Sequence, residues 1–367
     1  MTLLARDPQE AWVGAGVHSW DEFTKLREVV IGDASGARLP DLSDMSAWLT
    51  CFPHLTEREI KQVRSGDYPR KVIEEANEDL HALDRALKDL DVVTHRPTAV
   101  NHSSPFASPD WTSRGFFSYC PRDLTLILGQ TIVETPSPTR ARYFENLALR
   151  QIFQRKFDEG ATWIAAPRPR LTDELFTLGE DGFPRLGEDE PAFDAANILR
   201  VGADLFYQVS RSGNERGYEW LKSIAAVVAP NVQVHPLRGV YQNVHIDSTI
   251  TVLRPGLVLL NPERIAPYEV PAPFDQWDIV WCPQPEPSAT NARHTLSESW
   301  ISMNLLVVQP NLVIVESTQP ALIKTLENTG IDVVPLTLRH AQTLGGGFHC
   351  VTLDLVREGE CESYFDR

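Results

Sequence analysis

The sequence predicts an α/β protein in which one structural unit recurs about five times. The first observation is a repeated pair of apolar strands joined by a tight-turn dipeptide. The second is the helical spacing and the further strand that tend to follow each pair. The third is that polar side chains precede each pair at equivalent places. A unit of this kind cannot bury its apolar face alone, so we expect the copies to pack together, most naturally in a closed ring.

The strand pairs are predicted from five segments with turn residues at their centres. Each segment has an apolar run, then one of the dipeptides GQ, GA, PG, PN or EG, then a second apolar run. The segments are LTLILGQTIVET from Leu124, ANILRVGADLFYQVS from Ala196, STITVLRPGLVLLNP from Ser248, MNLLVVQPNLVIVE from Met303 and VTLDLVREGECESYF from Val351. The sequence therefore predicts five hairpins, of which the last lies at the C-terminus.

Helices are predicted where apolar residues recur three and four positions apart. The predicted helices cover residues 140–160, 214–230 and 319–330, each followed by a strand-like run, and a further helical face runs from Val72 to Leu90 before DVVTHRP. The segments GEDGFPRLGEDEP and YEVPAPFD are interpreted as insertions and not as linkers. We therefore expect one domain over residues 1–367, with a short N-terminal extension at residues 1–16.

Composition limits the class of function. The formal net charge of −16 disfavours nucleic acid as a partner and would attract small cationic substrates. Five cysteines without a CxxC pair argue against a disulfide framework and for a reducing compartment. No apolar run reaches the roughly 20 residues of a membrane-spanning helix, and the N-terminal residues do not resemble a signal peptide. We expect a cytoplasmic protein that does not bind membranes.

Polar residues stand directly before each predicted hairpin. They are Asp123, then Asp194, then His245 and Asp247, then Ser297, Glu298 and Ser299, and finally His349 and Cys350. If the copies surround an axis, these positions converge on it. Sequence-distant Cys, His and Asp side chains commonly assemble catalytic sites in this way. The glycines of LGGGFHC would let the backbone turn tightly and deliver Cys350 to the shared cleft.

Simpler interpretations exist for each residue taken alone. Cys350 could be a small buried apolar residue, and the glycine run could be only a flexible loop. His245 and Asp247 could ligate a metal, although no HExxH or clustered Cys/His pattern supports this. Asp123 and Asp194 could be turn or cap residues. Their common placement in the repeat favours a site.

The stretches CPRDLTLILGQTIVETP, FDAANILRVGADLFY, HIDSTITVLRPGLVLLNPER, SWISMNLLVV and LGGGFHCVTLDLVR resemble the arginine amidinotransferases. The resemblance runs from HSWDEFTKLREVVIG to the C-terminus. FDAAN and SGNERG are closer to the inosamine-phosphate branch of that family than to its glycine branch. The resemblance implies a five-bladed α/β propeller of ββαβ modules with pseudo-fivefold symmetry, which agrees with the repeat.

The resemblance also implies a role for each candidate residue. Cys350 matches the nucleophile, His245 the acid/base, Asp194 its orienting carboxylate, Asp123 and Asp247 the pair that grips the guanidinium, Arg264 the arginine that holds the donor's α-carboxylate, and Ser297 a further donor contact. Glu298 departs from the pattern, because the glycine enzyme has a second serine there. His349 has no matching role and is interpreted as structural.

The implied reaction passes the amidino group of L-arginine to a primary amine through an amidino-cysteine, with ping-pong kinetics and release of ornithine. It requires no metal and no organic cofactor, and a homodimer is possible. Because the chain is acidic and Glu298 could pair with an ammonium, we expect lysine as the acceptor, giving homoarginine in bacterial specialised-metabolite or toxin biosynthesis. The alternatives are an inosamine phosphate acceptor, an arginine-deiminase-type hydrolase, and a non-catalytic propeller that serves as a binding module.

Overall fold

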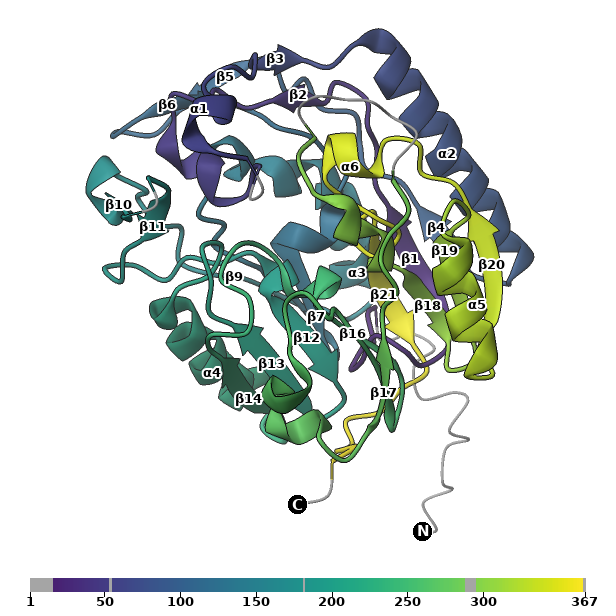
Figure 1. Cartoon of the computed structure of the whole chain (residues 1–367). Helices are drawn as coiled ribbons and strands as arrows, with labels where there is room; N and C mark the ends of the chain where they lie inside the picture. Colours follow the sequence, from purple (N-terminus) through teal and green to yellow (C-terminus); the bar gives the residue numbers. More distant parts are fainter. Residues whose placement is uncertain (1–15, 53–54, 181, 288–294, 366–367) are drawn as a thin grey trace.

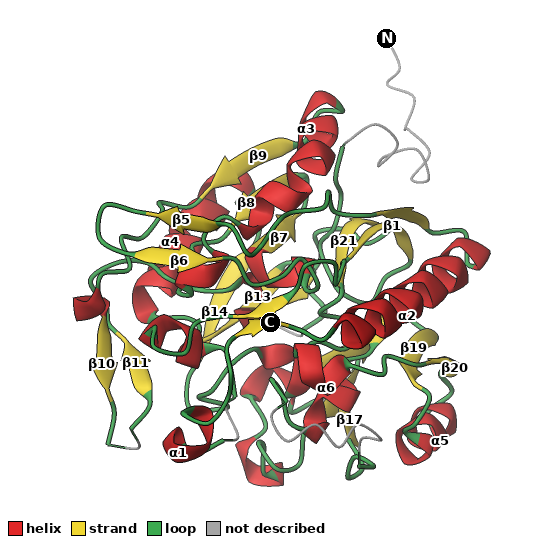
Figure 2. Cartoon of the chain, turned by 90° about the horizontal axis from the view of Figure 1, so that it is seen from above, coloured by secondary structure: helices red, strands yellow, loops and turns green. Residues whose placement is uncertain are grey.

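A computed structural model describes residues 16–52, 55–180, 182–287 and 295–365. The predicted extension at residues 1–16 lies outside these residues except for Gly16. Small sheets surround the middle of the molecule, and the long helices lie toward its periphery (Figures 1 and 2).

The described residues form five three-stranded sheets of one kind. In each, a first strand pairs antiparallel with a second, and the second pairs parallel with a third. Four of the sheets are β7 (Thr125–Leu128), β8 (Thr131–Glu134) and β9 (Thr162–Ala165); β12 (Ile198–Val201), β13 (Asp204–Gln208) and β14 (Gln233–Leu237); β15 (Ile250–Arg254), β16 (Leu257–Leu260) and β17 (Asp278–Trp281); and β18 (Leu306–Gln309), β19 (Leu312–Glu316) and β20 (Asp332–Leu336). Four of the five predicted hairpins are thereby confirmed.

The prediction of a fifth hairpin from Val351 is wrong. Strand β21 (Thr352–Arg357) pairs antiparallel with β1 (Leu26–Ile31), which pairs parallel with β4 (Val93–His95). The two ends of the chain therefore complete one sheet together. The physical reason is that the second half of β1 is apolar and buries Val29, Val30 and Ile31 completely, so β1 takes the place that a returning C-terminal strand would fill.

Helices connect the second and third strands in four of the five sheets. They are α2 (Arg70–Asp89), α3 (Arg150–Asp158), α4 (Glu215–Val228) and α5 (Pro320–Asn328). The predicted apolar face of α2 is confirmed, since Leu80, Leu83 and Leu87 are fully buried. Between β16 and β17 the chain forms only 3₁₀ turns, because the prolines of YEVPAPFD prevent regular α-helical hydrogen bonding.

The helix predicted over residues 140–160 is shorter than expected. Its first half forms two 3₁₀ helices, Arg140–Arg142 and Glu145–Leu149, and α3 begins only at Arg150. In this conformation Arg142 and Glu145 point inward and are almost completely buried. The irregular backbone thus places two charged side chains in the interior, where a surface helix would have exposed them.

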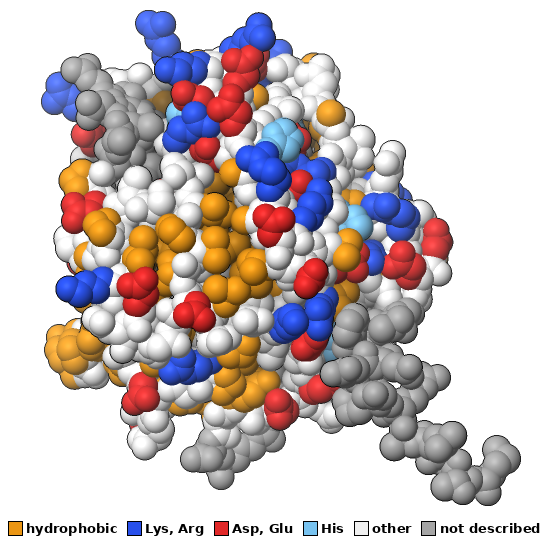
Figure 3. Space-filling view, turned by 90° about the vertical axis from the view of Figure 1, so that its right-hand side faces the viewer, with side chains coloured by type: hydrophobic (Ala, Val, Ile, Leu, Met, Phe, Trp, Pro, Cys, Tyr) orange, Lys and Arg blue, Asp and Glu red, His pale blue; other side chains and the backbone are white. Residues whose placement is uncertain are grey.

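Shorter elements cover the remaining connections. They are β2 (Arg38–Leu39), β3 (Gly66–Asp67), β5 (Pro105–Ala107), β6 (Thr112–Arg114), β10 (Phe176–Leu178), β11 (Pro184–Leu186), α1 (Glu57–Ile60) and α6 (Ala341–Leu344). The insertion predicted at GEDGFPRLGEDEP contains β11, which pairs antiparallel with β10 directly before it. On the face shown in Figure 3, acidic and basic side chains are interspersed around a band of apolar side chains.

A buried ionic cluster joins β21, β12 and the 3₁₀ helix Pro121–Leu124 that precedes β7. Asp354 on β21 accepts hydrogen bonds from Arg122 at 2.5 Å, Arg200 at 3.0 Å and Arg357 at 2.7 Å. Burial would raise the pKa of Asp354, but the three arginines hold it well below its usual range. Because each charge has a partner, the cluster avoids the penalty of an isolated buried ion. It fixes the strands whose preceding turns carry the candidate site.

Candidate active site

Turns that precede the first strands bring the predicted residues together. The relevant 3₁₀ helices are Pro121–Leu124, Ala195–Asn197, Ile246–Ser248 and Ser299–Met303, and a further turn precedes β21. The first contacts the second, the second contacts the third, and the third contacts the fourth. The expected convergence of these positions is confirmed, although the fifth of them does not introduce a hairpin.

His245 lies between two carboxylates. Its Nε2 is 3.0 Å from Asp194 Oδ2, and its Nδ1 is 3.8 Å from Asp123 Oδ1. Burial would lower the pKa of His245, but the charge of Asp123 and the hydrogen bond with Asp194 raise it well above its ordinary value. The two carboxylates therefore favour the imidazolium form of His245.

Cys350 is buried beside Asp247. Its thiol donates a hydrogen bond to Asp247 Oδ2 at 3.2 Å, and its backbone N–H donates to Asn304 Oδ1 at 2.9 Å. Contact with the Cys120 thiol, burial and the charge of Asp247 together raise the pKa of Cys350 well above its ordinary value, whereas interaction with His245 lowers it. These surroundings favour the thiol form of Cys350, and a bound cation near Asp247 would favour the thiolate.

The glycines before Cys350 have a steric role. Gly345 has a φ of +74°, a conformation that side chains disfavour. A Cβ at Gly346 would lie 2.4 Å from the Cys120 sulfur, which is closer than van der Waals contact allows. The glycines therefore let the turn pass directly over Cys120 and place Cys350 in the cavity.

Arg264 is held at the other side of the cavity. Its Nη1 donates to the Ser248 hydroxyl and the Thr249 hydroxyl, both at 2.8 Å, and its guanidinium lies over the Tyr241 ring at 3.7 Å. Its Nη2 pairs with Glu298. The hydroxyl of Ser297 is buried and has no hydrogen-bond partner among the described residues. Glu298 thus already has a cationic partner in the unliganded chain.

Three further groups take part that the sequence analysis did not select. Arg142 donates to Asp123 Oδ2 at 2.7 Å and forms two hydrogen bonds with Glu145 at 2.9 and 2.6 Å. Asn304 holds the Cys350 backbone, and it is a polar residue two positions before the first strand of the fourth hairpin, β18. No sequence signal distinguished Arg142 and Glu145, because opposite charges three residues apart usually form a pair on a helix surface.

One cavity of about 640 Å³ contains this arrangement. Among its lining residues are Asp123, Arg142, His245, Asp247, Arg264 and Cys350, together with Ser297 and Glu298. Asp194 lies behind His245 and is fully buried. The structure thus brings all eight predicted site residues to one place.

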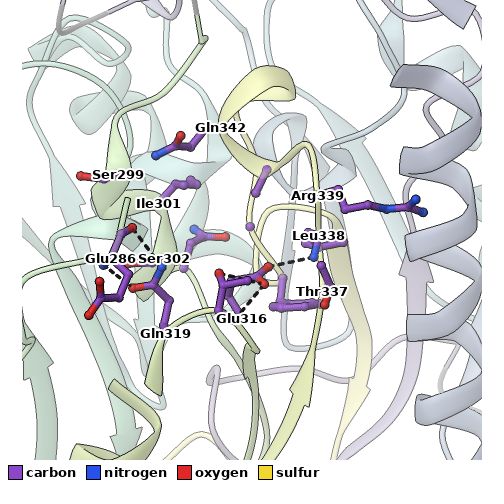
Figure 4. A pocket seen from close by; sticks show the side chains of 15 residues that line it. Glu286, Ser299, Ile301, Ser302, Glu316, Gln319, Thr337, Leu338, Arg339 and Gln342 are labelled. Carbon is purple, nitrogen blue, oxygen red and sulfur yellow. Dashed lines mark hydrogen bonds between the residues drawn. The ribbon is translucent and has the colours of Figure 1, made fainter. Parts of the chain in front are cut away.

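A second cavity of about 700 Å³ lies behind the 3₁₀ helix Ser299–Met303 and contains none of these eight residues. Figure 4 shows that its polar side chains come from β19, from the segments after β17, β19 and β20, from the 3₁₀ helix Ser299–Met303 and from α6. Glu316 accepts a hydrogen bond from the Leu338 backbone, and Gln319 pairs with the Glu286 backbone, so these groups satisfy one another. We take the cavity of Cys350 as the candidate site.

Within the described residues, no three His, Cys, Asp or Glu side chains are placed to hold a metal ion. The same residues contain no helix whose length and apolar character suit a membrane span.

Comparison with known proteins identifies the family. The chain is 44% identical over 344 residues to inosamine-phosphate amidinotransferase 1 of Streptomyces glaucescens, covering 94% of this chain and 97% of the relative. It is 32% identical over 356 residues to L-arginine:L-lysine amidinotransferase of Pseudomonas savastanoi pv. phaseolicola, covering 95% and 96%. The solved structure of the inosamine-phosphate amidinotransferase of Streptomyces griseus superposes with a TM-score of 0.89 at 44% identity, covering 95% of this chain and 99% of that structure. No family model matches the chain.

The fold and the site define an enzyme of the α/β class with a cysteine, a histidine and several carboxylates in one central cavity. The chain belongs to the amidinotransferase family.

Proposed function

We propose that the enzyme transfers the amidino group of L-arginine to a primary amine, through a covalent intermediate on Cys350. The observation that carries the proposal is the placement of Cys350, His245 and two cavity-facing carboxylates around one cavity. Guanidinium is delocalised and is a poor electrophile, so it requires a strong nucleophile in a fixed geometry. A cysteine thiolate and two carboxylates provide both.

Asp123 and Asp247 would hold the planar guanidinium by charge-assisted hydrogen bonds. Asp123 Oδ1 is buried without a hydrogen-bond partner among the described residues, which suits an acceptor waiting for a cationic ligand. The positive charge of the ligand would offset the field of Asp247 and lower the pKa of Cys350. Binding of arginine would thereby create the nucleophile.

The thiolate then attacks the central guanidinium carbon, and the bond from that carbon to Nε of arginine breaks. The leaving amine is too basic to depart as an anion, so the His245 imidazolium donates a proton to it, and ornithine leaves. The acceptor amine attacks the amidino carbon, gives a proton to His245, and the bond to sulfur breaks. Asp194 would keep the imidazole ring oriented in both half-reactions.

Arg264 and Ser297 would bind the α-carboxylate of the donor. Arg264 lines the cavity, is fixed by Ser248 and Thr249, and retains its stacking on Tyr241. The unpartnered Ser297 hydroxyl is a suitable second donor. We infer that Glu298 mainly orients Arg264, with which it is paired.

For the acceptor, we now favour an inosamine phosphate over lysine. The 44% identity to inosamine-phosphate amidinotransferases exceeds the 32% identity to the lysine enzyme. The argument for lysine depended on a free Glu298, and Glu298 is paired with Arg264. Lysine, with homoarginine as product, is retained as the second candidate because the chain is strongly acidic. Either acceptor suits antibiotic or toxin biosynthesis.

The test is a competition between an inosamine phosphate, lysine and glycine at equal concentration, with arginine as donor and mass analysis of products. Faster amidination of lysine would reverse the order of the two acceptors. Citrulline and ammonia, in place of ornithine and a guanidino product, would identify a hydrolase of the arginine-deiminase type. Arginine binding without turnover would identify a non-catalytic binding module.

We further infer that residues 1–367 form one domain and that the five sheets are blades of a five-bladed propeller with pseudo-fivefold symmetry. Their common strand order supports this arrangement. We expect a cytoplasmic enzyme that needs no metal or organic cofactor, and a homodimer that light scattering would detect.

A further inference from the structure

Behind each of the two carboxylates that would bind the guanidinium lies a buried cation, and behind each cation lies a glutamate. Asp123 pairs with Arg142, which pairs with Glu145; Asp247 pairs with His349, which pairs with Glu22. These two rows of charged side chains come from different parts of the sequence but have the same order in space: carboxylate, cation, carboxylate. Only the first carboxylate of each row was expected to contact the substrate.

The first row of charged side chains fixes Asp123 through one of its two carboxylate oxygens. Arg142 Nη1 donates a hydrogen bond to Asp123 Oδ2 at 2.7 Å. Asp123 Oδ1 remains buried without a hydrogen-bond partner among the described residues, and it lies 3.8 Å from His245 Nδ1. Glu145 accepts two hydrogen bonds from the same guanidinium. The guanidinium also lies over the Phe117 ring at 5.2 Å. Arg142 therefore cannot turn away from Asp123 without losing all of these contacts.

The second row of charged side chains fixes Asp247 in the same manner. His349 Nδ1 is 3.0 Å from Asp247 Oδ2, and its Nε2 is 3.4 Å from Glu22 Oε2. Burial and Arg122 oppose protonation of His349, but Glu22 and Asp247 raise its pKa above the ordinary value. His349 and Asp247 also keep each other charged, since the pKa of Asp247 is held well below its usual range despite burial.

We propose that Arg142 and His349 are positioning residues, which keep Asp123 and Asp247 ionised and aimed at the cavity before arginine enters. The inference rests on the proposed function, because it concerns arginine as the ligand. A buried carboxyl without a cationic partner takes up a proton and then binds guanidinium poorly. For His349 this replaces the interpretation of a purely structural residue.

The chain offers matched controls for both residues. Arg140 is also buried and also donates hydrogen bonds to two carboxylates, Asp44 and Asp173, but it does not line the cavity of Cys350. His340 is a buried histidine that pairs with Glu75, away from that cavity. If buried arginines and histidines serve only the fold, the control substitutions should resemble the test substitutions.

The experiment measures binding of arginine and of its neutral analogue citrulline by calorimetry, in the Cys350→Ser background to prevent turnover. The test variants are Arg142→Met and His349→Leu, and the controls are Arg140→Met and His340→Leu. Loss of a partner from a buried charge pair should weaken arginine binding by at least about 30-fold in each test variant. Citrulline binding should change far less, because the ureido group that replaces the guanidinium is uncharged.

The pH dependence gives a second measurement. Asp123 faces His245, Asp194, Arg142, Glu145 and the thiols of Cys120 and Cys350. Burial already raises the pKa of Asp123, and Arg142 opposes that rise. In Arg142→Met the loss of arginine binding on acidification should therefore begin at a higher pH. Arg142→Lys and His349→Asn, which keep a donor, should recover part of the affinity and decide the question if the other variants do not fold.

Equal losses for arginine and citrulline, or equal losses in the test and control variants, would overturn the positioning role. Failure of Cys350→Ser itself to bind arginine would instead show that the proposed donor is wrong. Unchanged arginine binding in Arg142→Met and His349→Leu, with normal binding in the parent, would remove only the positioning inference.

Discussion

The two cavities have similar volumes but differ in how their polar groups are paired. The cavity around Cys350 measures about 640 Å³, and the cavity in Figure 4 about 700 Å³. Among the described residues, the first contains buried side-chain atoms without hydrogen-bond partners, Asp123 Oδ1 and Ser297 Oγ. The second contains no such buried atom in the same part of the chain.

The difference shows which property indicates a ligand site. A buried polar atom without a partner costs free energy, and such an atom on the wall of a cavity can gain a partner from a ligand. Volume carries no such information. If this comparison is right, substitutions in the first cavity affect catalysis strongly and equivalent substitutions in the second do not.

The largest expected effect is that of Cys350→Ser. A serine hydroxyl is not ionised by the same surroundings, so turnover should fall by at least about 1,000-fold while arginine still binds. Steady-state release of ornithine and calorimetry measure the two properties. Ser302→Ala, in the second cavity, is the matched control and should leave both unchanged. A comparable loss in the control would mean that the comparison of cavities is wrong.

The next effect concerns His245 and Asp194 as one unit. His245→Ala should lower kcat by about 100-fold to 10,000-fold, because an acid/base group is lost. Residues that act together lose activity non-additively, so the double variant with Asp194→Asn should be little worse than His245→Ala alone. Single-turnover kinetics of the four enzymes provide the measurement. Additive losses would indicate that the two residues act separately.

A smaller effect is expected from Arg264→Gln. Loss of the guanidinium that would pair with the donor's α-carboxylate should raise KM for arginine by about 10-fold to 100-fold. Agmatine lacks this carboxylate, so its KM should change much less. Arg254, which lies outside the cavity and donates to the Thr329 backbone, provides the control Arg254→Gln. If arginine and agmatine lose equally, Arg264 does not bind the donor's carboxylate.

The smallest effect is expected from Glu298→Ser. Because Glu298 is partly exposed and pairs with Arg264, the ratio of kcat/KM for lysine to that for an inosamine phosphate should change by less than about threefold. Competition assays with both acceptors measure the ratio directly. A selective loss of more than about tenfold with lysine would show that Glu298 binds an acceptor ammonium after all.

Sequence patterns predicted the repeated unit and its polar turns because both depend on local signals. Turn dipeptides, apolar periodicity and the residues before each strand are all short-range features, and they led to Cys350, His245 and the aspartates. The closure of the fifth sheet was missed, because pairing of Leu26–Ile31 with Thr352–Arg357 joins residues more than 300 positions apart and leaves no local mark.

Arg142 and His349 illustrate a second limit. Their positions depend on the irregular backbone at 140–149 and on Glu22, a residue far away in sequence. The pairing of Glu298 with Arg264 was missed for the same reason, and it changed the preferred acceptor. Which charges are paired in the interior is a property of tertiary packing, which residue types alone do not specify.

The central claim is that Cys350 carries the amidino group between the two substrates. The most direct measurement is incubation with arginine in the absence of an acceptor, followed by acid quench and mass analysis of peptides. The account predicts release of ornithine and an amidino adduct on the peptide that contains Cys350. Since Cys120 lies beside Cys350, the peptides of both must be resolved. An adduct on Cys120 or Cys282, or ornithine released without any adduct, would contradict the account.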